Sequence, residues 1–551
     1  MKARWAGLVV LALVLVGCGG IPTSGSVQEG ALIDEEDLPD VTYRALGPQA
    51  GATPEQIMQG FIAAATNPLE DYAVARSFLA EDVDWNPNEV TRIRTGVGVP
   101  RPESDTEFSY TLTSAAYVNN RGQYFEGSPT SEKLDFVLAQ NSDEEWRITS
   151  APDGIVLSQG AFGAIFDPYP LYYFDPTNNY LIPDLRWFPR TAKLSTRIVS
   201  TLLEGQASWL TQGVTTTYFP VGTELASTVS TEGDSATVDF NGQFLDAPAE
   251  QRQLMRQQLG ASLAVSDVRI TVNGVNVDIP ESGAPQAILH PQVDDRLLVR
   301  RDDSFGYLTS AGSVSPLAGM SPEVIQLGAL DATLARDRHS TAVLAADGAH
   351  LIFDSSADAV LVDARPGLVA AALDNAGFVW TIPNSDATAI SAIDAEGTAH
   401  QIDGGQFAGR AISLSVSRDG ARLLVLVATD GGPKLAVAGI VRRDGVPAQL
   451  GAAVFLTVDA QSIPLDAAWV DENTVATLTR ADDSANATVT RYTLGGSSAS
   501  AGRVEGGIAI AGGNGGADGL RVLTVDGDVY LPRGNGWADT NNSVTFIGTQ
   551  Q

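Results

Sequence analysis

The sequence contains a single cysteine, Cys18, and only four histidines in 551 residues. With one thiol the chain forms no internal disulfide, so its folded parts depend on buried apolar side chains. Scarce histidine also means few general bases and few metal ligands. The four are His290, His339, His350 and His400, and none stands three or four residues from another. This spacing does not support a histidine-rich zinc site, and we expect no metal and no cofactor.

Positive charge is scarce as well. The 34 Lys and Arg residues stand against 66 Asp and Glu, which gives a formal net charge of −32 at pH 7. Nucleic-acid binding requires clustered Lys and Arg, which are absent, so we expect no nucleic-acid partner. Hydrophobic residues make up 44% of the chain and charged residues 18%, which leaves ample apolar surface to bury. The length predicts roughly three to five domains.

Motifs of enzymes are missing too. The sequence has no G-x-S-x-G, no P-loop and no G-x-G-x-x-G. The segment 82–86 resembles the start of a calcium loop, but Pro87 stands where an EF-hand has Gly and Ile93 where it has Glu. A pair of Asp or Glu residues in a glycosidase cleft stays open as an alternative, because no pair stands out. We therefore predict that the protein is not an enzyme.

The amino terminus carries the strongest motif. Lys2 and Arg4 precede an uncharged apolar run, residues 5–17, that is too short to span a bilayer comfortably and fits a signal peptide, residues 1–17. The run ends in Leu-Val-Gly-Cys, which resembles the bacterial lipobox. We expect cleavage between Gly17 and Cys18 and lipidation of the Cys18 thiol. The protein would then be lipid-anchored at the extracytoplasmic face of the cell membrane. An ordinary signal peptide that contains a cysteine is the alternative.

The next segments predict a tether and a first domain. Residues 18–48 are rich in Gly, Ser, Pro and acidic residues, which is typical of a flexible spacer. Folding is expected to begin at Thr53, because Thr53-Pro54-Glu55-Gln56 combines an N-cap, a helix-starting proline and a capping box. Two helical stripes followed by alternating strands predict an α+β domain over residues 49–165. Its order of elements resembles the NTF2-like fold.

Residues 166–190 are unusually aromatic, and they also contain several prolines. This composition predicts an irregular strap between domains, without a regular helix or strand. Two interpretations stay open: the aromatic rings pack between domains, or they form an exposed patch that docks a partner. The candidate partner-binding residues are Tyr172, Tyr173, Phe174 and Trp187.

Two further domains are expected. Residues 191–283 alternate helical stripes and strands and end in a hairpin around Asn273-Gly274, an order that resembles the GerMN domain of bacterial envelope and sporulation proteins. From 284 to 551 short apolar strands alternate with turns such as Asp347-Gly348 and Asp419-Gly420. This pattern predicts an all-β propeller of about six blades, with five or seven as alternatives.

A lipobox, an NTF2-like region, a GerMN-like unit and a propeller, in this order, resemble the LpqB lipoprotein family of actinobacteria. The resemblance implies an accessory of the MtrA-MtrB two-component system, which acts on the ectodomain of the sensor histidine kinase MtrB and so on cell-wall and division genes. An alternative from another class is an envelope protein that binds or processes peptidoglycan. Trp380 and Trp469 of the propeller would offer stacking surfaces for it, but we expect both to fill the core between blades. A structural envelope lipoprotein is the third interpretation.

Overall fold

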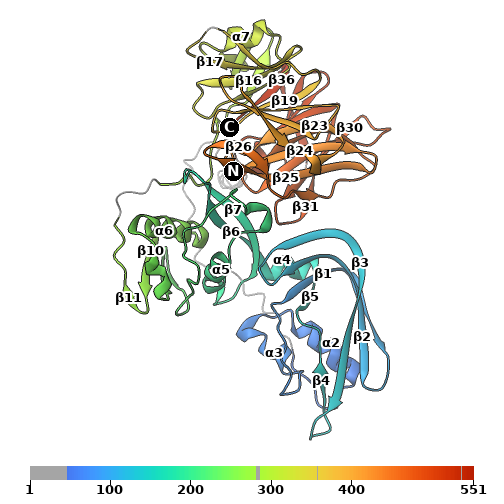
Figure 1. Cartoon of the computed structure of the whole chain (residues 1–551). Helices are drawn as coiled ribbons and strands as arrows, with labels where there is room; N and C mark the ends of the chain where they lie inside the picture. The colour runs from blue at the N-terminus through green and yellow to red at the C-terminus, as the bar shows by residue number, and fades with distance from the viewer. Residues whose placement is uncertain (1–45, 281–285, 357, 515, 535) are drawn as a thin grey trace, which may run out of the picture. The chain divides into compact units, whose positions relative to one another are not determined.

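The computed structural model describes residues 46–280, 286–356, 358–514, 516–534 and 536–551 (Figure 1). The cleavage and lipidation sites expected at Gly17 and Cys18 lie outside the described residues. Among the helices of the described segments, none is long and apolar enough to cross a membrane.

The first region is an α+β domain, as expected. Thr53 caps its first helix: the Thr53 side chain accepts a hydrogen bond from the Gln56 amide, and the Gln56 side chain accepts one from the Thr53 amide, which confirms the capping box. The second expected helix is only four residues long. In the sheet, which has the order β4-β3-β2-β1-β5, only the β1–β5 pairing is parallel. The elements are α2 (Pro54–Ala64), η2 (Leu69–Asp71), α3 (Ala73–Arg76), β1 (Val90–Pro102), β2 (Glu107–Asn119), β3 (Tyr124–Gln140), β4 (Trp146–Ser150) and β5 (Ile155–Ser158).

The aromatic segment forms a regular β-hairpin, so the prediction of an irregular strap is wrong. After α4 (Gln159–Ile165), strand β6 (Phe166–Phe174) pairs antiparallel with β7 (Leu181–Pro189) over the full length of both strands. Prolines are tolerated here because a two-stranded ladder has only edge strands, where a missing N–H does not interrupt a central ladder. The hairpin thus carries its aromatic side chains at fixed positions.

The second α+β region follows the hairpin. Its sheet has the order β11-β10-β9-β8, with a parallel β9–β10 pair. Asn273 and Gly274 have φ values of 49° and 79°, the positive angles that a tight hairpin turn requires, so the predicted hairpin is confirmed. Tyr173 and Phe188 of the preceding hairpin pack into this region's core. The elements are α5 (Leu194–Leu203), η3 (Ser208–Leu210), β8 (Ser230–Glu232), β9 (Ser235–Phe240), η4 (Gly242–Asp246), α6 (Ala249–Leu263), β10 (Asp267–Val272) and β11 (Val275–Asn276).

The third region is a propeller-like β domain, which confirms the expected fold class (Figure 1). Its described strands form six four-stranded runs: β14-β13-β12-β36, β15–β18, β19–β22, β23–β26, β28–β31 and β32–β35, while β27 pairs with β25. The inner strands β36, β15, β19, β23, β28 and β32 contact one another in this order, and β32 contacts β36 again. The ring therefore closes, and the last strand, β36, completes the run that begins with β12.

The bounds of this domain's elements are β12 (Leu298–Arg301), β13 (Ser304–Leu308), β14 (Val314–Pro316), α7 (Ser321–Gln326), β15 (Asp331–Leu334), β16 (Ser340–Ala345), β17 (Gly348–Phe353), β18 (Val360–Asp363), β19 (Leu368–Leu373), β20 (Val379–Pro383), β21 (Ala389–Ile393), β22 (Ala399–Asp403), η5 (Gly405–Phe407), β23 (Arg410–Val416), β24 (Arg422–Thr429), β25 (Gly432–Arg443), β26 (Val446–Leu450), β27 (Val454–Leu456), β28 (Ile463–Trp469), β29 (Thr474–Arg480), β30 (Asn486–Thr493), β31 (Ser498–Glu505), β32 (Gly507–Ala511), η6 (Gly516–Gly519), β33 (Arg521–Thr524), β34 (Asp528–Arg533), β35 (Gly536–Ser543) and β36 (Phe546–Gln550).

A buried ion pair fixes the hairpin to its neighbours. The Arg186 guanidinium on β7 donates from Nε and Nη2 to the Asp184 carboxylate, at 3.0 and 2.5 Å, and from Nη1 to the carbonyl of Arg121, at 2.8 Å. The Asp184 carboxylate also accepts the amide of Ala207 at 2.7 Å. Both side chains are almost wholly buried, so these hydrogen bonds replace the water that the two charges lost.

We expect Asp184→Ala to destabilise the protein by about 3–5 kcal/mol, because it leaves the buried Arg186 charge without its partner. Asp167→Ala on β6 is the matched control. Its partner is Arg190, and both of these side chains are exposed, so the loss should stay below about 1 kcal/mol. Denaturant unfolding followed by circular dichroism measures both values. Equal losses in the two variants would contradict the role given to the buried pair.

Candidate functional site

The structure buries most of the side chains that were predicted to dock a partner. Tyr172 is 2% exposed, and Tyr173 and Phe174 are 0% exposed. A partner cannot reach these rings in the folded chain, so the docking interpretation is wrong for these three residues. Trp187 is only partly buried, and its indole Nε1 donates to the carbonyl of Gly495 in the propeller domain at 2.7 Å. Tyr173 instead packs inside the core of the second α+β region, whereas Trp187 packs against the core of the first domain and bonds to the propeller domain.

The two tryptophans considered as glycan-stacking surfaces are buried as well. Trp380 donates from Nε1 to the Asp374 carboxylate at 2.8 Å inside the propeller domain. Trp469 lies against the guanidinium of Arg422, 4.9 Å from the ring centre to the guanidinium carbon. Both rings fill apolar cores of the propeller domain, as expected, and neither presents a free face for the stacking alternative.

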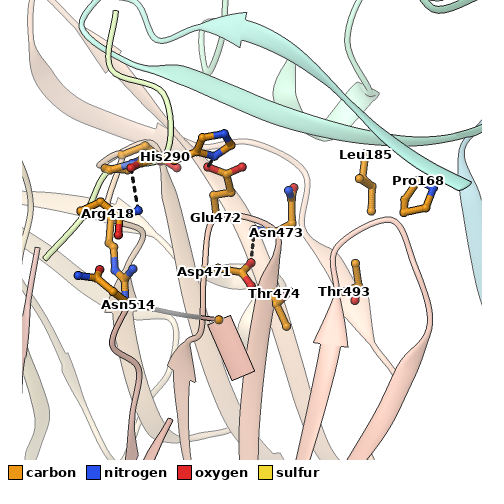
Figure 2. A pocket seen from close by; sticks show the side chains of 14 residues that line it. Pro168, Leu185, His290, Arg418, Asp471, Glu472, Asn473, Thr474, Thr493 and Asn514 are labelled. Atoms are coloured by element: carbon orange, nitrogen blue, oxygen red, sulfur yellow. Dashed lines mark hydrogen bonds and ion pairs between the residues drawn. The ribbon is translucent and has the colours of Figure 1, made fainter. Parts of the chain in front are cut away.

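A pocket of about 450 Å³ lies where the hairpin meets the propeller domain. Figure 2 shows Arg418 and Asn514 on one side, Asp471 to Thr474 in the middle, and Pro168 and Leu185 of the hairpin on the other side. Residues 290–292, which belong to the segment that enters the propeller domain before β12 (the entering segment), line a further part. The complete lining is Pro168, Leu185, His290, Pro291, Gln292, Arg418, Asp419, Asp471, Glu472, Asn473, Thr474, Thr493, Asn514 and Gly516.

Glu472 joins the elements around this pocket. Its carboxylate accepts the Tyr172 hydroxyl at 3.0 Å and pairs with His290 Nδ1 at 2.7 Å. Burial raises the pKa of Tyr172 far above its usual value, and the neighbouring Glu472 carboxylate raises it further. The phenol therefore stays protonated and remains a hydrogen-bond donor over the whole physiological range. One carboxylate thus links the hairpin, the entering segment and the turn between β28 and β29.

A predicted turn positions Arg418. Ser417 Oγ donates to Asp419 Oδ1 at 2.5 Å, Asp419 also pairs with the buried Arg422, and Gly420 has a φ of 73°. This is the Ser-x-Asp-Gly pattern of the sequence, and it holds the turn between β23 and β24 rigid. Arg418, the variable position of the pattern, lines both the pocket and the central channel of the ring. Burial lowers the pKa of the Arg418 guanidinium.

The central channel of the ring, about 370 Å³ in volume, contains two carboxyl groups that the sequence analysis missed. Asp466 on β28 accepts the amide of Ala467 and, across to the next run of strands, the amide of Ile510, both at 2.8 Å. Desolvation raises the pKa of Asp466 to about 7, and the Asp331 carboxylate adds to the rise. Desolvation likewise raises the pKa of Asp331 to about 6. An acid inside the otherwise apolar segment 463–469 was the available signal.

These carboxyl groups make stability depend on pH. The folded protein holds the Asp466 proton more tightly than the unfolded chain, whose Asp pKa is about 3.8, so stability falls as pH rises from about 4 through about 7. Asp466→Asn removes the charge and keeps an acceptor. We expect its melting temperature to exceed the wild-type value at pH 8, by roughly 2–4 °C for each kcal/mol of stability gained, and the gap to narrow to about a quarter at pH 4.5.

Thermal unfolding between pH 4.5 and 8 checks this expectation. Asp526→Asn, in an exposed turn, is the matched control and should follow the wild-type curve. If Asp466→Asn also follows that curve, the channel carboxyl does not control the pH dependence.

In the described part of the chain, no three or more His, Cys, Asp or Glu side chains are placed to hold a metal ion. The pocket combines a guanidinium, carboxylates and apolar walls, and its polar groups converge on one space. This is the chemistry of a binding site.

The fold is that of a multi-domain, mostly β protein with a carboxyl-terminal propeller-like domain. Three family models match the chain: "Lipoprotein LpqB, N-terminal domain" over residues 47–163, "Sporulation and spore germination" over 170–278, and "Lipoprotein LpqB beta-propeller domain" over 299–545. The chain belongs to the LpqB lipoprotein family. The second model begins inside the hairpin, which therefore forms part of that domain.

Relatives called lipoprotein LpqB occur in several actinobacteria. The one from Streptomyces coelicolor is 25% identical over 82% of each chain. The one from Thermobifida fusca is 30% identical over 50% of this chain and 47% of its own length, and the one from Cutibacterium acnes 26% identical over 52% and 49%. The chain thus spans about half the length of the latter two. Among solved structures, the first GerMN domain of the Bacillus subtilis sporulation protein GerM is similar, with 21% identity over 22% of this chain and 92% of that chain and a TM-score of 0.18.

Proposed function

We propose that this protein is a lipid-anchored, extracytoplasmic lipoprotein that binds the ectodomain of an MtrB-like sensor histidine kinase and modulates its signalling, without catalysing a reaction itself. The kinase as partner comes from the family resemblance. Binding changes kinase output only if it favours one kinase conformation over another. A rigid body meets this requirement better than loosely linked domains, because it transmits strain from its contact surface.

The observation that supports this proposal is the bonding of the β6–β7 hairpin to both neighbours. Arg186 donates to the carbonyl of Arg121 in the first domain. Tyr172 and Trp187 bond to Glu472 and to the Gly495 carbonyl in the propeller domain. The hairpin therefore contacts both neighbouring regions, and direct bonds such as Arg197 to Asn88 and the Ser498 amide to Glu126 add to it, as a protein ligand of defined shape requires.

The anchor fits the same proposal. The relatives of this chain are named lipoproteins, and Cys18 is the residue that would carry the lipid. Cleavage before Cys18 removes Lys2 and Arg4, so the mature charge becomes −32 − 2 = −34. A strongly acidic body is repelled by anionic headgroups, and attachment through the amino terminus would leave that body free to meet a kinase ectodomain.

Binding of the body to the kinase tests the proposal. We expect residues 19–551 to bind the isolated MtrB-like ectodomain saturably in calorimetry, whereas the ectodomain of an unrelated sensor kinase should not bind. Residues 46–283 and 284–551, tested separately, locate the contact. Deletion of the gene should also alter phosphorylation of the cognate response regulator. No binding by the whole body, at a salt concentration that screens its charge, would contradict the proposal.

The anchor has its own test. Cys18→Ser should abolish incorporation of labelled palmitate in cells and move the protein from the membrane pellet to the supernatant, because the lipid supplies the membrane affinity. Ser24→Ala, a few residues downstream, is the matched control and should stay labelled and membrane-bound. Continued labelling of the Cys18 variant would show that the lipobox was misassigned.

A further inference from the structure

We infer that the pocket between the β6–β7 hairpin and the propeller domain binds a small zwitterionic ligand, an amino acid or a short peptide, with its carboxylate on Arg418 and its ammonium group at Asp471. This inference goes beyond the proposed function, and it rests on the pocket alone. It follows from which charged side chains of the pocket already have a partner among the described residues and which do not.

Arg418 is the group that requires a ligand. Its side chain lines the pocket, yet within the described residues its guanidinium makes no hydrogen bond and has no carboxylate within 4.0 Å; its carbonyl alone is used, by the Asn375 side chain. The other guanidiniums nearby are paired, Arg422 with Asp419 and Arg442 with Asp374. Arg418 is only half-buried, and a guanidinium at the wall of a pocket without a partner among the described residues favours a carboxylate, which it binds through two parallel hydrogen bonds.

The acidic groups indicate the second charge. Asp471 interacts with Arg418 through space but lies too far away for an ion pair. Among the residues that the structure describes, only the amide of Asn473 bonds to its carboxylate, at Oδ1 and 2.8 Å. Both oxygens of Glu472 are already used by Tyr172 and His290. Because the pocket holds more negative than positive charge, a simple anion would be repelled. A molecule with both an ammonium group and a carboxylate satisfies Asp471 and Arg418 together.

The size and walls of the pocket agree with this class. A volume of about 450 Å³ lies in the range of small-molecule sites and leaves room for side-chain atoms beyond the two charged groups. Pro168 and Leu185 from the hairpin and Pro291 from the entering segment supply an apolar wall. A bound ligand would therefore touch the hairpin and the propeller domain at once and favour their contact.

Calorimetric titration of the full-length protein in detergent tests the inference. The probes are the twenty common amino acids, the dipeptide Ala-Ala, N-acetylalanine, which lacks the ammonium group, and alaninamide, which lacks the carboxylate. We expect at least one amino acid or Ala-Ala to bind, and both blocked compounds to bind at least about tenfold more weakly than that probe. Tighter binding of Ala-Ala than of any amino acid assigns the site to peptides, and the reverse assigns it to free amino acids.

Variants connect the binding to these residues. Arg418→Ala and Asp471→Asn should each weaken the best probe at least about tenfold. Arg410→Ala, on β23 with an exposed side chain, is the matched control and should leave the affinity unchanged. Thermal unfolding verifies that each variant is folded. The inference is overturned if no probe binds, if N-acetylalanine binds as well as the zwitterions, or if both site variants bind like the control. Kinase binding is measured separately, so failure of either proposal is recognised by itself.

Discussion

The buried ion pair between Arg186 and Asp184 is the constraint on which the arrangement of this protein depends. Two charges withdrawn from water are tolerable only when their hydrogen bonds are replaced, and the replacements come from the turn before β3, from β7 and from Ala207. The hairpin is thereby fixed at its first-domain side. On its opposite side, Tyr172 donates a hydrogen bond to Glu472 of the propeller domain, and Pro168 and Leu185 form one wall of the pocket. The candidate site lies between this hairpin and the propeller domain, so its shape depends on how the two are bonded.

Local sequence rules predicted the elements whose geometry depends on neighbours in the chain. The capping box at Thr53 and the turn at Asn273-Gly274 formed as expected, since each depends on a few adjacent residues. The rules failed at residues 166–190. Prolines indicated irregular structure, but in a two-stranded ladder a proline interrupts no central strand. Local sequence patterns could not predict the burial of Tyr172 either, because its partner Glu472 lies 300 residues away in the chain.

The candidate site was hidden in the sequence for the same reason. Its lining comes from positions between 168 and 516, and no motif connects them. Arg418 lies in a turn that the sequence did predict, but only the structure shows that its guanidinium faces the pocket with no acceptor from the described residues. If a ligand holds hairpin and propeller domain together, the presence of that ligand would change the rigidity of the body that is proposed to act on the kinase. Ligand binding and the proposed action on the kinase would then both depend on the contact between the hairpin and the propeller domain.

The most direct test of this account is a double-mutant cycle across the contact between Tyr172 of the hairpin and Glu472 of the propeller domain. The free energy of unfolding is measured for wild type, Tyr172→Phe, Glu472→Ala and the double variant, because Ala removes the acceptor that Gln would keep. If the hairpin is bonded to the propeller domain as described, the coupling energy is about 1.5–3 kcal/mol in favour of the contact, because the acceptor is a carboxylate. A coupling energy of zero within error would contradict the account, because hairpin and propeller domain would then be energetically independent.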